Sequence, residues 1–224
     1  DLHFNDYKDS IRSYLCAPKD SSFNAVMSIK EIGATVIFKD NIIDILKAKK
    51  NTTEENGMRN AHIRDGVALT KFIYWIKNTK NNSQSEISAS NYLDNLRSKN
   101  KNFFSLSFPT IAGSGPNGAI VHYRASNKTN RKLKKDDLFL VDSGAQYFDG
   151  TTDVTRTIAF SKVTYEQKKM YTLVLKGHIA VALSTFNEKE SGKTLDRHAR
   201  KFLKKEKLNF DHGTGHGVGS CLNV

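Results

Sequence analysis

The stretch Leu138–Thr157, LFLVDSGAQYFDGTTDVTRT, decides the fold of this chain because it has the pattern of two strands joined by a turn. Its first four residues are a continuous apolar run, as in a buried strand. Residues 154–159 (VTRTIA) alternate as a second strand would. Between the two runs stands Asp149-Gly150, a strong turn dipeptide. The stretch therefore predicts a β-hairpin.

Two carboxylates stand at the base of this hairpin. Asp142 closes the first expected strand and Asp153 opens the second, so we expect the two residues to lie roughly opposite and to project to one face. Like charges on one face repel, and a divalent cation is the obvious partner to cancel them. Two aspartates beside a turn are also common as solvated turn formers, so the pair alone leaves both interpretations open.

A segment rich in glycine and histidine lies near the end of the sequence, at residues 211–219 (DHGTGHGVG). His212 and His216 have the spacing of a helical zinc site, but the four glycines exclude a stable helix. We expect a loop that presents imidazoles, where the missing side chains let a metal or a substrate approach closely. A third histidine, His122, ends the expected short apolar strand 119–121.

The helices expected from the sequence flank the hairpin. The first two begin near Thr52 and at Ser85, and the inward face of the longer one is Met58, Ala61, Asp65, Leu69, Phe72 and Ile76. A third begins after Thr164, runs to about Thr185, and carries small residues that would allow close approach to a sheet. A fourth covers residues 195–205, and residues 208–210 have the character of a strand.

The composition and one motif bear on which classes of partner the chain can bind. The net charge of +12 suggests nucleic acid or an anionic surface, but the basic residues are scattered and no aromatic residues interleave with them as stacking platforms. No run approaches the ~20 apolar residues of a membrane helix. The Gly113–Gly118 stretch matches G-x-G-x-x-G, but a strand-like run follows it where a dinucleotide site needs a helix. We therefore expect no nucleic-acid, membrane or dinucleotide partner.

Four motifs together resemble one enzyme family. They are GPNGAIVHYRAS at 115–126, VDSGAQYFDGTTDVTRT at 141–157, LKGHIAV at 175–181 and HGTGHGVGSCLNV at 212–224. In order and spacing they are similar to the aminopeptidase P (Xaa-Pro aminopeptidase) family of the pita-bread metallopeptidases, family M24, over about residues 54–224. Prolidase is the nearest competitor within that class.

The resemblance implies the fold and the domains. It predicts an α+β pita-bread (creatinase/aminopeptidase) fold with a curved antiparallel sheet. Residues 51–224 would be an incomplete catalytic domain. Residues 1–50 would be the remnant of the non-catalytic, creatinase-like N-terminal domain that precedes it in the family.

The resemblance also implies a role for each candidate site residue. Asp142 would chelate one metal ion, Asp153 would bridge two, and His216 would bind the other. The complete site would hold two Mn²⁺ ions, with Co²⁺ or Zn²⁺ as alternatives, and these would activate a shared water. His122 and His212 would be catalytic residues on the substrate side that steady the scissile peptide and its oxyanion. Arg156 would support the surroundings of Asp153.

The implied reaction is release of the N-terminal residue from peptides whose second residue is proline. The two cysteines, Cys16 and Cys221, make no disulfide framework, so we expect a reducing cytoplasm as the compartment. A homodimer is one assembly open to the complete protein. One departure from the family pattern matters: two further glutamate ligands and another histidine follow the glycine–histidine loop in the family, whereas this sequence ends at Val224. We therefore predict a chain that is inactive or nearly so by itself. The alternatives are a non-enzymatic pita-bread interaction module and a degenerate gene fragment.

Overall fold

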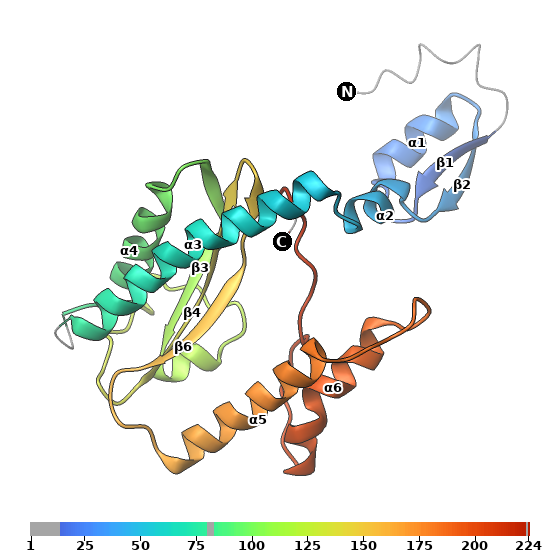
Figure 1. Ribbon diagram of the computed structural model, residues 1–224. Helices are drawn as coiled ribbons and strands as arrows, with labels where there is room; N and C mark the ends of the chain where they lie inside the picture. The colour runs from blue at the N-terminus through green and yellow to red at the C-terminus, as the bar shows by residue number, and fades with distance from the viewer. Residues whose placement is uncertain (1–13, 80–82, 223) are drawn as a thin grey trace. The chain divides into compact units, whose positions relative to one another are not determined.

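A computed structural model describes residues 14–79, 83–222 and 224 (Figure 1). The chain divides into two compact units, Asp1–Asn51 and Thr52–Val224. The described part of the first unit is a small β-α-β arrangement in which two strands pair in parallel and a second helix follows. Its elements are β1 (Tyr14–Pro18), α1 (Phe23–Glu31), β2 (Thr35–Lys39) and α2 (Ile42–Ala48).

The second unit is built on an antiparallel sheet whose central strand is β4 (Leu138–Tyr147). On one side β4 pairs with β3 (Phe103–Ser114), with irregularities in the register. On the other side it pairs with β6 (Val154–Ala159), and the short strand β5 (Gly150–Thr151) closes the turn. The predicted hairpin is therefore present, and its turn is Phe148-Asp149, one residue earlier than the expected Asp149-Gly150, because Gly150 already pairs with Tyr147.

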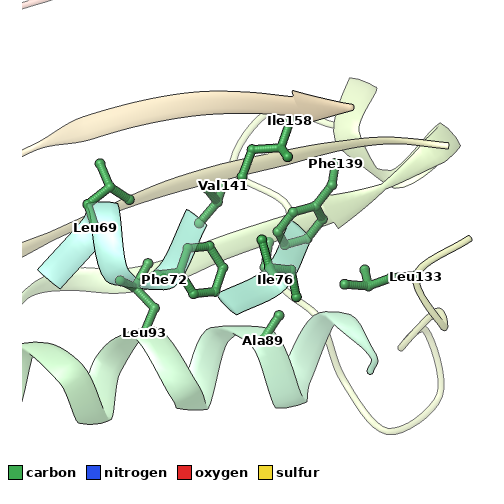
Figure 2. Close-up of a cluster of buried hydrophobic side chains, with 10 residues drawn as sticks. Leu69, Phe72, Ile76, Ala89, Leu93, Leu133, Phe139, Val141 and Ile158 are labelled. Carbon is green, nitrogen blue, oxygen red and sulfur yellow. The ribbon is translucent and has the colours of Figure 1, made fainter. Parts of the chain in front are cut away.

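Two helices pack against this sheet, α3 (Thr52–Asn78) and α4 (Glu86–Ser98). The predicted inward face of α3 is confirmed from its second residue onward, since Met58 is only half-buried. The buried members are Ala61, Asp65, Leu69, Phe72 and Ile76. Figure 2 shows Phe72 and Ile76 of α3 between Leu93 and Ala89 of α4 and the sheet residues Val141 and Phe139. Removal of this apolar surface from water holds the two helices on the sheet.

A buried polar network also joins the helices to the sheet. The Arg97 guanidinium on α4 donates two 2.8 Å bonds to the Asp65 carboxylate on α3, and both side chains are almost completely buried. The hydroxyl of Tyr147 on β4 donates a 2.9 Å bond to the same carboxylate. A paired and hydrogen-bonded charge is the only kind that a core tolerates at low cost.

The remaining helices are α5 (Tyr165–Ala182) and α6 (Gly192–Lys205), which pack on each other. The capping box at Thr164 and Gln167 is present, and the helix ends three residues before the expected Thr185. The expectation that its small residues approach a sheet is wrong. A side-chain carbon at Gly177 would collide with the backbone of Ala199, so the missing side chain lets α6 approach instead.

Two expected strands are absent from the described residues. Residue 119 ends a 3₁₀ helix, η2 (Gly115–Ala119), and residues 120 and 121 lead through a turn to His122, whose φ of 55° is left-handed. Residues 208–210 are extended chain without a strand partner, so backbone pairing does not stabilise a strand there. Among the described helices, none has the length and apolar character needed to cross a membrane.

Candidate metal centre

The two aspartates come together across the β4–β6 ladder. Asp142 lies within β4 and pairs with Thr155, and Asp153 immediately precedes β6. The two residues, expected to lie roughly opposite, are therefore offset by two positions, and Asp142 lies inside its strand where the sequence indicated its end. Side chains two positions apart along a strand project to the same face. Both carboxylates consequently line the same cavity.

Thr152 holds the chain in place beside Asp153. Its amide donates a 2.8 Å bond to the carbonyl of Ala145, and its hydroxyl accepts a 2.9 Å bond from the amide of Ala145. The Ser107 hydroxyl donates a 2.8 Å bond to the Thr152 carbonyl. This approach requires glycine at position 144, because a Cβ there would overlap the Thr152 carbonyl oxygen. The hydrogen bonds of Thr152 thus fix the position of the adjacent Asp153.

The electrostatics of the pair favour a bound cation. Burial raises the pKa of the Asp153 carboxyl above its ordinary value, and the Asp142 carboxylate raises it further, whereas His216 lowers it. The Oδ1 atom of Asp142 is buried and has no hydrogen-bond partner within the described residues. A buried carboxylate oxygen without a donor is costly unless a cation or water meets it.

The glycine–histidine segment brings an imidazole to the aspartates. The Nε2 atom of His216 lies 3.6 Å from Oδ2 of Asp153, and the His216 side chain is 58% exposed. His212 and His122 line the same cavity, whose volume is about 560 Å³. The structure therefore gathers all five predicted site residues around one cavity.

Arg200 of α6 holds the start of this segment. Its guanidinium donates bonds of 2.6 Å and 2.8 Å to the carbonyls of Phe210 and His212 and lies 3.9 Å above the Phe210 ring. The Phe210 ring in turn stacks on the His212 imidazole at 4.7 Å. Asp196 orients Arg200 and accepts a 2.5 Å bond from the Thr214 hydroxyl. A helix thereby positions a loop that has no regular structure of its own.

The donor set suits a divalent transition metal ion, because carboxylates and imidazole are ligands of Mn²⁺, Co²⁺ and Zn²⁺. The orphaned Asp142 oxygen also indicates a missing partner on this face. Within residues 14–79, 83–222 and 224, however, no three candidate ligands lie close enough together to enclose an ion as they stand. The residues fit a metal ion in chemistry but do not form a closed coordination shell.

Sequence patterns did not reveal every residue that shapes the site. Thr152 and Arg200 carry no recognisable motif of their own, and their roles depend on hydrogen bonds to residues outside their own segment. The role expected for Arg156 near Asp153 stays a prediction, since the described residues include no hydrogen bond or ion pair between the two. Arg156 is exposed, and its guanidinium donates to the carbonyl of Thr155, because residues 153 and 156 project to opposite faces.

The sequence model of metallopeptidase family M24 matches residues 56–224. The chain belongs to this family. An M24 relative from Paracoccidioides brasiliensis (strain Pb03), named "Probable Xaa-Pro aminopeptidase P", is 53% identical over 181 residues, which are 80% of this chain and 29% of the relative. A protein of the same name from Sordaria macrospora is 49% identical and is covered to 30%. The chain thus spans less than a third of the length of these relatives.

Solved structures show that the M24 chain has part of the pita-bread fold. X-prolyl aminopeptidase from Caenorhabditis elegans, described as a cytosolic enzyme with a di-nuclear active site, matches with a TM-score of 0.80 and 36% identity over 90% of this chain and 37% of its own. Prolidase from Pyrococcus furiosus matches with a TM-score of 0.81 over the whole of this chain and 65% of its own. At 24% identity, the prolidase shows the fold alone.

Proposed function

We propose that this chain carries part of the catalytic centre of an Xaa-Pro aminopeptidase, a metallopeptidase that removes the N-terminal residue from peptides with proline second. The observation that carries the proposal is the convergence of Asp142, Asp153 and His216 on one cavity, where an Asp142 oxygen lacks a partner. The names of the relatives that are about half identical support the aminopeptidase reaction over the prolidase reaction.

We propose that Asp142, Asp153 and His216 are metal ligands and that Mn²⁺ is the resident ion, with Co²⁺ or Zn²⁺ as alternatives. The di-nuclear site of the C. elegans enzyme supports two ions. When bound, the ions supply Lewis-acid chemistry that makes water nucleophilic near neutral pH. The Asp153 carboxyl, which interacts with that of Asp142, would be a ligand on the aspartate side of the cavity.

His122 and His212 are the chain's candidates for contact with the peptide. Both line the cavity that contains the two aspartates, and both imidazoles are exposed to it. An imidazole N–H placed there donates to the scissile carbonyl and strengthens its bond as negative charge develops on that oxygen. The compartment we propose is the cytosol, as described for the C. elegans enzyme.

Calorimetric titration with Mn²⁺ tests the ligand assignment without requiring activity. We expect the wild-type chain to bind Mn²⁺ and Asp153→Ala to bind it at least about tenfold more weakly, because a ligand is lost. Asp136→Ala is the matched control, since Asp136 is an exposed carboxylate just before β4 that does not line the cavity. Equal affinity in wild type and Asp153→Ala contradicts the assignment.

The reaction is tested with an Xaa-Pro-Xaa peptide. Because the chain spans 29% of the P. brasiliensis relative, the assay uses the chain alone and the chain co-expressed with the remaining catalytic segment of that relative. We expect Mn²⁺-dependent release of the first residue from the paired protein, and its loss in Asp153→Ala. A folded, Mn²⁺-loaded pair that leaves the peptide intact contradicts the proposed function.

A further inference from the structure

Glu86 is a buried carboxylate with no role in the chemistry described so far. It is the first residue of α4, and its side chain is completely buried. No ion pair within the described residues includes it, yet both of its oxygens are occupied. A buried carboxylate in a core is expensive unless several donors compensate for the loss of water.

All of those donors come from the chain around His122. Oε1 accepts bonds of 2.8 Å and 3.0 Å from the amide of Ser114 and the side-chain amide of Asn117. Oε2 accepts bonds of 2.9 Å each from the hydroxyl of Tyr123 and the amide of Arg131. The carboxylate thus joins the end of β3, the helix η2, and both ends of the segment 123–131.

His122 lies inside the region that Glu86 gathers. It immediately precedes Tyr123 and comes three positions after the end of η2, so bonds to Glu86 hold the chain on both sides. Its left-handed φ of 55° is an uncommon conformation for a residue other than glycine, and the bonds on both sides help to hold it. Asn117 also donates a 2.8 Å bond to the Tyr123 hydroxyl, which closes the ring of contacts.

We propose that Glu86 is a positioning residue, which holds the 114–131 segment so that His122 faces the cavity containing Asp142 and Asp153. This inference rests on the proposed function for the catalytic meaning of His122, but the geometry itself is independent of it. Glu86 acts as an acceptor only. Glutamine at this position would turn an N–H₂ group toward two donors, so the ring of contacts could not close.

The ring nitrogens of His122 report on this geometry directly. We expect Glu86→Gln to shift or broaden the His122 signals in proton–nitrogen correlation spectra of the histidine rings, assigned by their loss in His122→Asn. His62, on the exposed side of α3, serves as the internal reference. Asp94→Asn is the matched control, because Asp94 is another α4 carboxylate bonded to β3, through Thr110, but outside the 114–131 segment. The Asp94→Asn substitution should leave the His122 ring signals unchanged.

Tyr123→Phe keeps the experiment decisive if Glu86→Gln fails to fold. It removes a single bond to Glu86 next to His122 and should shift the same signals. Unchanged His122 signals in a folded Glu86→Gln chain, or in Tyr123→Phe when the first variant unfolds, overturn the proposal. Equal shifts in Asp94→Asn and at His62 also overturn it, because they indicate a general loss of structure.

Activity of the paired protein gives a second readout. We expect Glu86→Gln to lower kcat about 10- to 100-fold, the range typical of residues that orient a functional group, with KM and the Kd for Mn²⁺ changed less than about twofold. A fall in Mn²⁺ affinity with kcat unchanged contradicts the positioning role. Failure of the proposed function has a different signature, since every variant and the wild type would then be inactive, and the spectra alone decide the role of Glu86.

Discussion

Asp142 lies on a hydrogen-bonded sheet and Asp153 directly before one of its strands, whereas His212 and His216 lie on the histidine segment, residues 211–219, which has neither helix nor strand. The sheet side, here called the aspartate wall, consists of β4, β6 and the buried residue Thr152 between the strands. The histidine segment depends instead on side-chain bonds from α6. The β4–β6 ladder and the hydrogen bonds of buried Thr152 therefore place the aspartates, while side-chain bonds from one helix hold the histidine segment.

The two regions should respond differently to mutation. A change in the aspartate wall disturbs the packed core and lowers the free energy of unfolding of the whole unit. A change at the support of the histidine segment releases a loop with few buried contacts, so its main effect is on local order. The predictions that follow test this contrast, in order of decreasing expected effect.

The largest effect should come from the ion pair behind the aspartate wall. Asp65→Ala leaves the Arg97 charge buried without its partner and removes the acceptor of the Tyr147 hydroxyl. We expect a loss of about 3–5 kcal/mol in the free energy of unfolding, measured by urea titration. Glu55→Ala, which breaks the exposed Glu55–Arg59 pair on the same helix, should cost far less. Similar losses in both variants would show that burial is not the deciding factor.

Two glycine substitutions should change stability in opposite directions. Gly144→Ala drives a methyl group into the Thr152 carbonyl, so we expect a loss of about 1–3 kcal/mol and weaker Mn²⁺ binding as Asp153 moves away from Asp142. Gly66→Ala, on α3, meets no atom within 4 Å and should stabilise the helix by about 0.5–1 kcal/mol. Thermal unfolding measures both, and a Gly144→Ala chain as stable as wild type would contradict the close approach.

Arg200→Ala should have a local effect. It removes the bonds to the Phe210 and His212 carbonyls, so we expect faster amide hydrogen exchange across residues 208–218 and little change in the exchange of β4. Arg197→Ala, an exposed arginine on the same helix, is the control. If exchange of the histidine segment is equally slow in both variants, α6 does not position this segment.

The smallest effect concerns Asp94. Burial raises the pKa of its carboxyl, although the bond from Thr110 opposes the shift. The folded state therefore holds the proton more tightly than the unfolded chain, and stability falls as pH rises from the unfolded pKa of about 3.9 through the higher folded value. Asp94→Asn should be at least as stable as wild type at pH 7, and the difference should disappear near pH 3. A wild-type chain that gains stability relative to Asp94→Asn as pH rises would contradict this sign.

The regular elements followed from local sequence patterns. The apolar spacing in residues 52–78 predicted the buried face of α3, and the residues after Ser85 and Thr164 predicted two helix starts, because spacing and capping act within a few residues. The strand predicted at residues 119–121 is absent because contacts with distant residues decide the structure there. Bonds from Ser114 and Asn117 to the distant Glu86 draw this part of the chain into η2 and a turn.

A local sequence pattern also does not show which element will pack against a given helix face. The small residues of α5 predicted a close approach, and that is what Gly177 permits, but the element that approaches is α6. Likewise, the hairpin pattern placed both aspartates near its base, but the pairing of Asp142 with Thr155 shows an offset that only the ladder register decides. Small side chains and an alternating pattern can be read from one segment of the sequence. Which element packs against that segment, and in which strand register, depends on a second segment as well.

The sequence by itself determined the helix faces, the hairpin, and the residue types of the candidate metal centre, because these depend on short-range periodicity and on the chemistry of single side chains. Only the tertiary structure decided which hydrogen bonds fix the functional segments. Thr152 fixes the chain beside Asp153, Glu86 accepts bonds from both sides of His122, and Arg200 bonds the carbonyl of His212. Each of these contacts joins residues on different elements, and their energies depend on burial and on the hydrogen-bond geometry that the assembled fold creates.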